Sequence, residues 1–145
     1  MKFAVLGAGA VGGYFGARLA EAGEDVTFIA RGAHLQAIRN SGLRIESENG
    51  DAHIHPARAT DDPADIGPVD YVLFAVKLFQ TEEVAAFAKP LVGPSTTLVA
   101  LQNGVECASV LSAAHGREKI LNGTSYIAAV ITDPGLIRQT GTFAS

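Results

Sequence analysis

The stretch that decides the fold is residues 2–30, KFAVLGAGAVGGYFGARLAEAGEDVTFIA. It begins with a short apolar run at 2–6, which predicts a buried strand that a glycine ends. Apolar side chains then recur at helical spacing over residues 11–22, and Gly23 predicts the end of that helix. A second apolar run at 25–30 has the length of a buried parallel strand. Together these segments predict a strand–helix–strand unit.

A glycine-rich turn joins the first strand to the helix, and it consists of Gly7, Ala8, Gly9, Ala10, Val11 and Gly12. The GxGxxG pattern is weak evidence alone, but it is informative between a strand and a helix. In dinucleotide-binding proteins the first glycine permits the tight turn, the second lets the backbone approach the pyrophosphate, and the third lets the helix pack closely. The helix N-terminus also offers unpaired N–H groups to an anion. We therefore expect these residues to bind the phosphates of a dinucleotide; the alternative is a purely structural turn.

The end of the second strand predicts which dinucleotide binds. NAD-binding proteins usually place Asp or Glu there, about 20 residues past the motif, to accept hydrogen bonds from the ribose 2′-hydroxyl. This chain has Ala30, Arg31 and Gly32 at that point. Because a guanidinium replaces the carboxylate, we predict NADP(H) as the cofactor, with Arg31 at its 2′-phosphate. The alternative is that Arg31 is a solvated loop residue.

Predicted strands and helices alternate along the rest of the chain. We expect helices at 34–42, 81–92 and 105–114, strands at 69–76 and 95–102, a hairpin over 43–57 that turns at 48–51, and two further strands around 133–135. This order is typical of an α/β fold of Rossmann type with a doubly wound, mostly parallel sheet. We expect a single domain over residues 1–145.

The composition excludes several classes of function. The 145 residues are 48% hydrophobic and 18% charged, which is typical of a soluble α/β protein. A net charge of −4 provides no basic surface for nucleic acid or an anionic membrane, and no apolar stretch reaches the roughly 18 residues of a membrane span. The single cysteine, Cys107, excludes an intramolecular disulfide. We expect a reducing, cytoplasmic setting.

Several short motifs fall at the predicted carboxyl ends of strands, where open α/β sheets bind their ligands. They are GAGAVGG at 7–13, Ala30-Arg31, Val76-Lys77 with Gln80, Gln102-Asn103-Gly104-Val105, and Gly123-Thr124 followed by Ala128-Ala129. Together they resemble the ketopantoate reductase (2-dehydropantoate 2-reductase) family over essentially the whole chain. The resemblance implies NADPH-dependent reduction of a small 2-keto acid, 2-dehydropantoate, to (R)-pantoate, a step toward pantothenate and coenzyme A.

The resemblance also implies roles for individual residues. Lys77 and Asn103 match catalytic positions that line the nicotinamide end of the cleft and contact the cofactor. Gln80 and Ala129 match further cofactor-binding positions, the latter through its backbone. A lysine offers positive charge to an anionic keto acid, and an asparagine can both donate and accept hydrogen bonds. The alternatives are that Lys77 is an ordinary exposed cation and that Asn103 caps the following helix.

Members of this family continue into a helical second domain that supplies a general-acid lysine and a substrate-binding carboxylate. Nothing in this sequence corresponds to that domain, so we expect an N-terminal, NADP-binding part that binds NADPH without measurable turnover. The face toward the second domain is expected to be apolar, which allows a homodimer. Two alternatives stay open: a related hydroxy acid or opine-type dehydrogenase, and a domain that senses NAD(P) without catalysis.

Three other features suggest chemistry less strongly. His53 and His55 share one face of a predicted strand, a spacing compatible with metal ligation, but no third ligand is evident and we expect no metal site. Cys107 follows a predicted helix N-terminus, where a thiol can be reactive, yet burial is the expected state. The Asp62-Pro63 pair is expected to start a helix rather than to form part of a carboxylate site.

Overall fold

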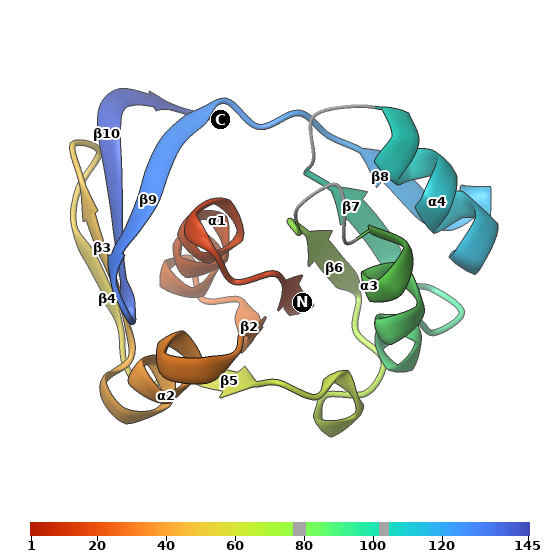
Figure 1. Ribbon diagram of the computed structural model, residues 1–145, viewed down its shortest axis with the longest axis horizontal. Coiled ribbons are helices and arrows are strands. Elements are labelled where there is room, and N and C mark those ends of the chain that lie inside the picture. Colours follow the sequence, from red (N-terminus) through yellow and green to blue (C-terminus); the bar gives the residue numbers. More distant parts are fainter. Residues whose placement is uncertain (77–80, 102–104) are drawn as a thin grey trace.

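The computed structural model describes residues 1–76, 81–101 and 105–145 of the chain (Figure 1). Within these ranges the chain forms a six-stranded sheet and a four-stranded sheet. Helix α1 (Ala10–Glu21) lies between the two sheets, as Figure 1 shows. No helix in the described residues is long and apolar enough to cross a membrane.

The larger sheet contains the predicted strand–helix–strand unit, and its neighbouring strands are all parallel. Its strands run in the order β5-β2-β1-β6-β7-β8, with the bounds β1 (Lys2–Leu6), β2 (Asp25–Ile29), β5 (Arg58–Thr60), β6 (Tyr71–Phe74), β7 (Thr97–Ala100) and β8 (Ile120–Asn122). The other helices are α2 (Gly32–Ser41), α3 (Thr81–Phe87) and α4 (Val105–His115). This arrangement confirms the predicted Rossmann-type α/β fold.

Side chains of β1 alternate between two cores, one on each face of the larger sheet. Ala4 and Leu6 pack into a cluster with β6 and β7 residues and with the inner faces of α3 and α4. Val5 points to the opposite face, where it packs with Phe28 of β2 and with residues of α1 and α2. A strand that is buried on both faces has a nearly continuous apolar sequence, which explains why residues 2–6 are almost all apolar.

A second sheet covers the outer side of α1. Its strands are β3 (Leu43–Ser47), β4 (Ala52–Ile54), β9 (Ile127–Asp133) and β10 (Leu136–Ala144), in the order β4-β3-β10-β9. The hairpin over 43–57 and the two strands around 133–135 were predicted, but the parallel pairing of β3 with β10 was not, because it joins segments that are far apart in the sequence. Gly13 permits α1 to approach this sheet, since a Cβ there would lie 2.3 Å from Cδ1 of Ile137.

Local chemistry explains where several elements begin and end. The helix predicted over 81–92 ends at Phe87, and a short 3-10 turn over Lys89–Leu91 follows with a proline inside it. Another 3-10 turn begins at Pro63, where the Asp62 side chain accepts a hydrogen bond from the backbone N–H of Ala64. The prediction that this aspartate starts a helical turn is therefore confirmed.

Candidate functional site

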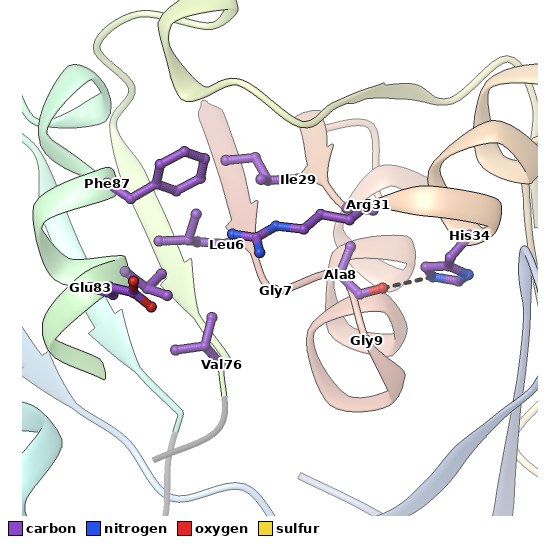
Figure 2. A pocket seen from close by; sticks show the side chains of 12 residues that line it. Leu6, Gly7, Ala8, Gly9, Ile29, Arg31, His34, Val76, Glu83 and Phe87 are labelled. Atoms are coloured by element: carbon purple, nitrogen blue, oxygen red, sulfur yellow. Dashed lines mark hydrogen bonds between the residues drawn. The ribbon is translucent and has the colours of Figure 1, made fainter. Parts of the chain in front are cut away.

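A cavity of about 430 Å³ opens at the carboxyl ends of β1 and β2 (Figure 2). Twelve residues line it: Leu6, Gly7, Ala8, Gly9, Ile29, Ala30, Arg31, His34, Val76, Glu83, Val84 and Phe87. Strand β1 lies between β2 and β6 in the sheet, so the strand order reverses at this point. Open α/β sheets bind their ligands at such a reversal, outside the carboxyl ends of the strands.

Two glycines of the turn are required by the fold itself. Gly7 has a φ of +92°, and a Cβ on it would lie 2.9 Å from the carbonyl oxygen of Ala75. A Cβ on Gly12 would lie 2.3 Å from the carbonyl oxygen of Gly7 and 3.1 Å from the Ala75 side chain. These two positions therefore serve the tight turn and the close packing of α1 on the sheet.

Gly9 differs from the other two glycines of the motif, Gly7 and Gly12. Its φ of −78° is open to any residue, and among the described residues no atom beyond its chain neighbours and its own helix backbone lies within 4 Å of a Cβ built on it. Neither backbone strain nor packing explains a glycine here, yet the residue lines the cavity. A bare backbone at this point lets a ligand come closer than any side chain would allow. The position thus fits the close approach of a pyrophosphate.

The N-terminus of α1 meets this cavity, and no acidic side chain of its own first turn competes for its N–H groups. Gly9 is the N-cap residue and has no side chain to accept from the helix, and no acidic residue occupies the first turn. The first N–H groups of an α-helix have no intrahelical acceptor. Backbone donors and the positive end of the helix dipole are consequently available to a phosphate at the turn formed by residues 7–12.

Arg31 lies at the start of α2, directly after β2, and its side chain is exposed. Figure 2 shows the guanidinium reaching over the cavity, and its Cζ atom lies 5.9 Å from the centroid of the Phe87 ring. Among the described residues no carboxylate forms an ion pair with it. The cation can therefore bind an external anion.

Helix α3 supplies a wall of the cavity that the sequence analysis missed. Glu83, Val84 and Phe87 lie on one face of this helix, at positions i, i+1 and i+4. One signal in the sequence could have indicated this wall: α3 is the helix that follows β6, and β6 is the strand next to β1. His34 of α2 was missed as well, because nothing in its local sequence distinguishes it from a solvated helix residue.

The structure brings part of the predicted site together. Four of the predicted residues line the cavity: Gly7, Ala8, Gly9 and Arg31. Ala10, Val11 and Gly12 follow directly as the first residues of α1. Lys77, Gln80 and Asn103 lie outside the described residues.

Ala129 is placed elsewhere. It lies on β9 of the second sheet, opposite Gln139 of β10, and packs against the core around α1. It is not one of the residues that line the cavity. Within the described part of the chain, its backbone is therefore not joined to the site formed by the glycine turn and Arg31.

The remaining candidates from the sequence are Cys107, His53 and His55. Cys107 is fully buried, as predicted, and burial raises the pKa of its thiol. The rings of His53 and His55 stack with centroids 5.5 Å apart, and Nε2 of His53 lies 2.8 Å from the carbonyl oxygen of Ser41. The residues that the structure describes contain no group of three or more His, Cys, Asp or Glu arranged to hold a metal ion.

The comparison with protein families agrees with the motifs. The family model described as ketopantoate reductase PanE/ApbA matches residues 3–144. This chain belongs to the ketopantoate reductase family. The predicted resemblance is thereby confirmed, and the family is one of NAD(P)-dependent oxidoreductases.

Several relatives show how much of their own length this chain matches. The 2-dehydropantoate 2-reductase of Mesorhizobium japonicum is 34% identical over 160 residues, which cover 96% of this chain and 49% of that protein. The crystal structure of 2-dehydropantoate 2-reductase from Porphyromonas gingivalis is 38% identical with a TM-score of 0.92, covering 99% of this chain and 53% of that one. The chain thus spans about half the length of these relatives.

The same fold also occurs in D-mandelate dehydrogenase. The structure of D-mandelate dehydrogenase with NADH and anilino(oxo)acetate is 25% identical with a TM-score of 0.87, and it covers 97% of this chain and 46% of that one. The solved structures that this chain is similar to therefore include one that contains NADH.

Proposed function

We propose that this chain is the cofactor-binding part of an NADPH-dependent reductase that converts 2-dehydropantoate to (R)-pantoate in the cytoplasm, on the route to pantothenate and coenzyme A. The observation that supports this most is the cavity that joins the glycine turn to Arg31. Gly9 leaves backbone open to a pyrophosphate, and Arg31, at the end of β2, forms no ion pair with a carboxylate of the described residues. Family membership supports the type of reaction.

The described residues would hold the adenosine half of NADPH. The pyrophosphate would accept hydrogen bonds from N–H groups at the start of α1, beside Gly9. Arg31 would pair with the 2′-phosphate, and the apolar wall at Phe87 would contact the adenine ring. When bound, NADPH supplies the hydride for the ketone.

Two residues outside the described ranges are proposed for the reacting end of the site. Lys77 would place its positive charge near the ketone and carboxylate of the substrate, and Asn103 would orient cofactor and substrate through its amide. Proton delivery to the ketone oxygen is proposed to depend on a lysine beyond this chain. General acid catalysis typically contributes about 10²–10⁴-fold to a rate. We therefore propose that this chain alone binds NADPH without measurable turnover.

Two experiments test the proposal. Calorimetric titration should show that NADPH binds more tightly than NADH, and absence of NADPH binding would contradict it. An absorbance assay at 340 nm should show no oxidation of NADPH with 2-dehydropantoate, whereas sustained turnover by the chain would mean that the proton donor lies within residues 1–145.

A second candidate is a related hydroxy acid dehydrogenase, which the likeness to D-mandelate dehydrogenase supports. It would use the same cofactor cavity with another 2-keto acid. A panel of 2-keto acids, tested with a full-length protein that contains this chain, would separate the two candidates. Preference for 2-dehydropantoate supports the first, and preference for an aromatic keto acid supports the second.

A further inference from the structure

The His34 side chain is hydrogen-bonded at both ring nitrogens. Its Nε2 atom lies 2.8 Å from the carbonyl oxygen of Ala8, in the glycine turn. Its Nδ1 atom lies 2.9 Å from the backbone nitrogen of Gly135, in the turn between β9 and β10. Figure 2 shows the ring beside Ala8, on the side away from Phe87. One side chain of α2 thus connects the glycine turn to the second sheet.

These two partners determine the tautomer of His34. The backbone N–H of Gly135 can only donate, so Nδ1 must accept and carries no hydrogen. The hydrogen of the neutral ring is then on Nε2, which donates it to the carbonyl oxygen of Ala8. A neutral imidazole with this tautomer satisfies both contacts.

The Gly135 end of this connection is held firmly. Gly135 has a φ of +77°, and a Cβ on it would lie 3.0 Å from the Cβ of Ala37 in α2. Its carbonyl oxygen accepts a hydrogen bond of 2.9 Å from the backbone N–H of Arg44, a residue of β3 in the second sheet. Because Gly135 is fixed on both sides, the imidazole is anchored where it meets Ala8.

Fixing the Ala8 carbonyl also fixes the next N–H group. The peptide between Ala8 and Gly9 is trans, so the N–H of Gly9 points opposite to the Ala8 carbonyl and away from His34. The turn is held on either side by hydrogen bonds from Ala8 N–H to the carbonyl of Ile29, at 3.0 Å, and from Gly13 N–H to the carbonyl of Gly9, at 2.7 Å. Within the part of the chain that the structure describes, the contact with His34 is the hydrogen bond that holds the Ala8 carbonyl between them.

We propose that His34 is a positioning residue, which sets the Ala8–Gly9 peptide so that the Gly9 N–H can bind the pyrophosphate of the cofactor. This inference rests on the proposed NADPH-binding function. It also assigns a role to the β9–β10 turn, which supports the phosphate site through the imidazole without touching the ligand. His34 acts through the peptide and not through its own contact with NADPH.

Substitutions can separate the two hydrogen bonds of the ring. The amide nitrogen of a glutamine reaches about as far as Nε2 of histidine, so His34→Gln keeps a donor for the Ala8 carbonyl. The amide oxygen of an asparagine reaches about as far as Nδ1, so His34→Asn keeps only an acceptor for Gly135. His53→Ala is the matched control, because His53 also bonds a backbone carbonyl through Nε2 but lies away from the cavity.

The first measurement is the dissociation constant of each variant for two ligands, NADPH and adenosine 2′-monophosphate, which lacks the pyrophosphate. We expect His34→Ala to weaken NADPH binding by about three- to tenfold, as for loss of a hydrogen bond, and to leave adenosine 2′-monophosphate unchanged. His34→Gln should restore most of the NADPH affinity and His34→Asn little of it. Unchanged NADPH affinity in His34→Ala, equal losses for both ligands, or rescue by asparagine alone would overturn the proposal.

The second measurement needs no cofactor. In the ligand-free, ¹⁵N-labelled chain, the Gly9 amide resonance should move in His34→Ala, return toward its original position in His34→Gln, and stay unchanged in His53→Ala. A Gly9 resonance that does not move in His34→Ala overturns the inference. If the unmodified chain fails to bind NADPH, the proposed function fails, and this resonance still decides whether His34 positions the turn.

Discussion

Replacing Arg31 with alanine should selectively weaken the binding of NADPH. Arg31 is exposed, extends over the cavity and has no carboxylate partner among the described residues, so its charge can pair with a 2′-phosphate. A hydrogen bond to a charged group contributes about 1.5–3 kcal/mol. Because solvent screens an exposed pair, we expect the lower end, about 1.5 kcal/mol or roughly tenfold in Kd.

NADH provides the internal comparison, since it lacks the 2′-phosphate. Its Kd should change by less than about twofold in Arg31→Ala, and high salt should weaken NADPH more than NADH. Arg31→Lys should fall between wild type and alanine, because a lysine keeps the charge but loses the bidentate fork. Arg39→Ala is the matched control: Arg39 is also exposed on α2, but it donates from Nε to the carbonyl of Ala59, away from the cavity.

Isothermal titration of these variants with both cofactors measures the difference directly. Equal losses for NADH and NADPH in Arg31→Ala would refute the assignment to the 2′-phosphate. A loss of NADPH affinity in Arg39→Ala as large as that in Arg31→Ala would show that general charge, and not the position of Arg31, determines the preference.

Three further predictions concern the turn, the thiol and the core. Gly9→Ala should keep the melting temperature but weaken NADPH, whereas Gly12→Ala should lower the melting temperature because its Cβ would meet the Gly7 carbonyl; the opposite pattern in thermal melts would contradict the roles of these glycines. Burial raises the pKa of Cys107, so less thiolate is present near pH 8, and iodoacetamide should label the folded chain at least about tenfold more slowly than the unfolded chain; equal rates would contradict its burial. Leu98→Ala should reduce the free energy of unfolding by about 2–5 kcal/mol in urea titrations, and a loss below about 1 kcal/mol would show that its core can collapse.

Local features of the sequence predicted four strands of the larger sheet, β1, β2, β6 and β7, and the centre of the site, whereas the short outer strands β5 and β8 were not predicted. The glycine turn and Arg31 stand directly after β1 and β2, so their positions follow from the strand ends without knowledge of distant contacts. Two-sided burial of β1 was equally visible, because its residues are almost all apolar. The family was recognised from motifs at the same strand ends.

Contacts between distant segments could not be predicted in this way. Pairing of β3 with β10 creates the second sheet, and no local pattern specifies the partner of either strand. The bond from Gly135 to His34 depends on that sheet, so it was missed for the same reason. The wall from α3 was missed because the sequence predicts that a helix follows β6 but not how that helix faces the cavity.

The most direct test of the central claim is an amide NMR titration of the ¹⁵N-labelled chain with NADPH and, separately, with NADH. If the cavity holds the adenosine half of NADPH, the largest shifts should occur at residues 7–12 and 31–34, and the Arg31 amide should respond more to NADPH than to NADH. Shifts confined to other parts of the chain, or no shifts at residues 7–12 at saturating NADPH, would contradict the claim.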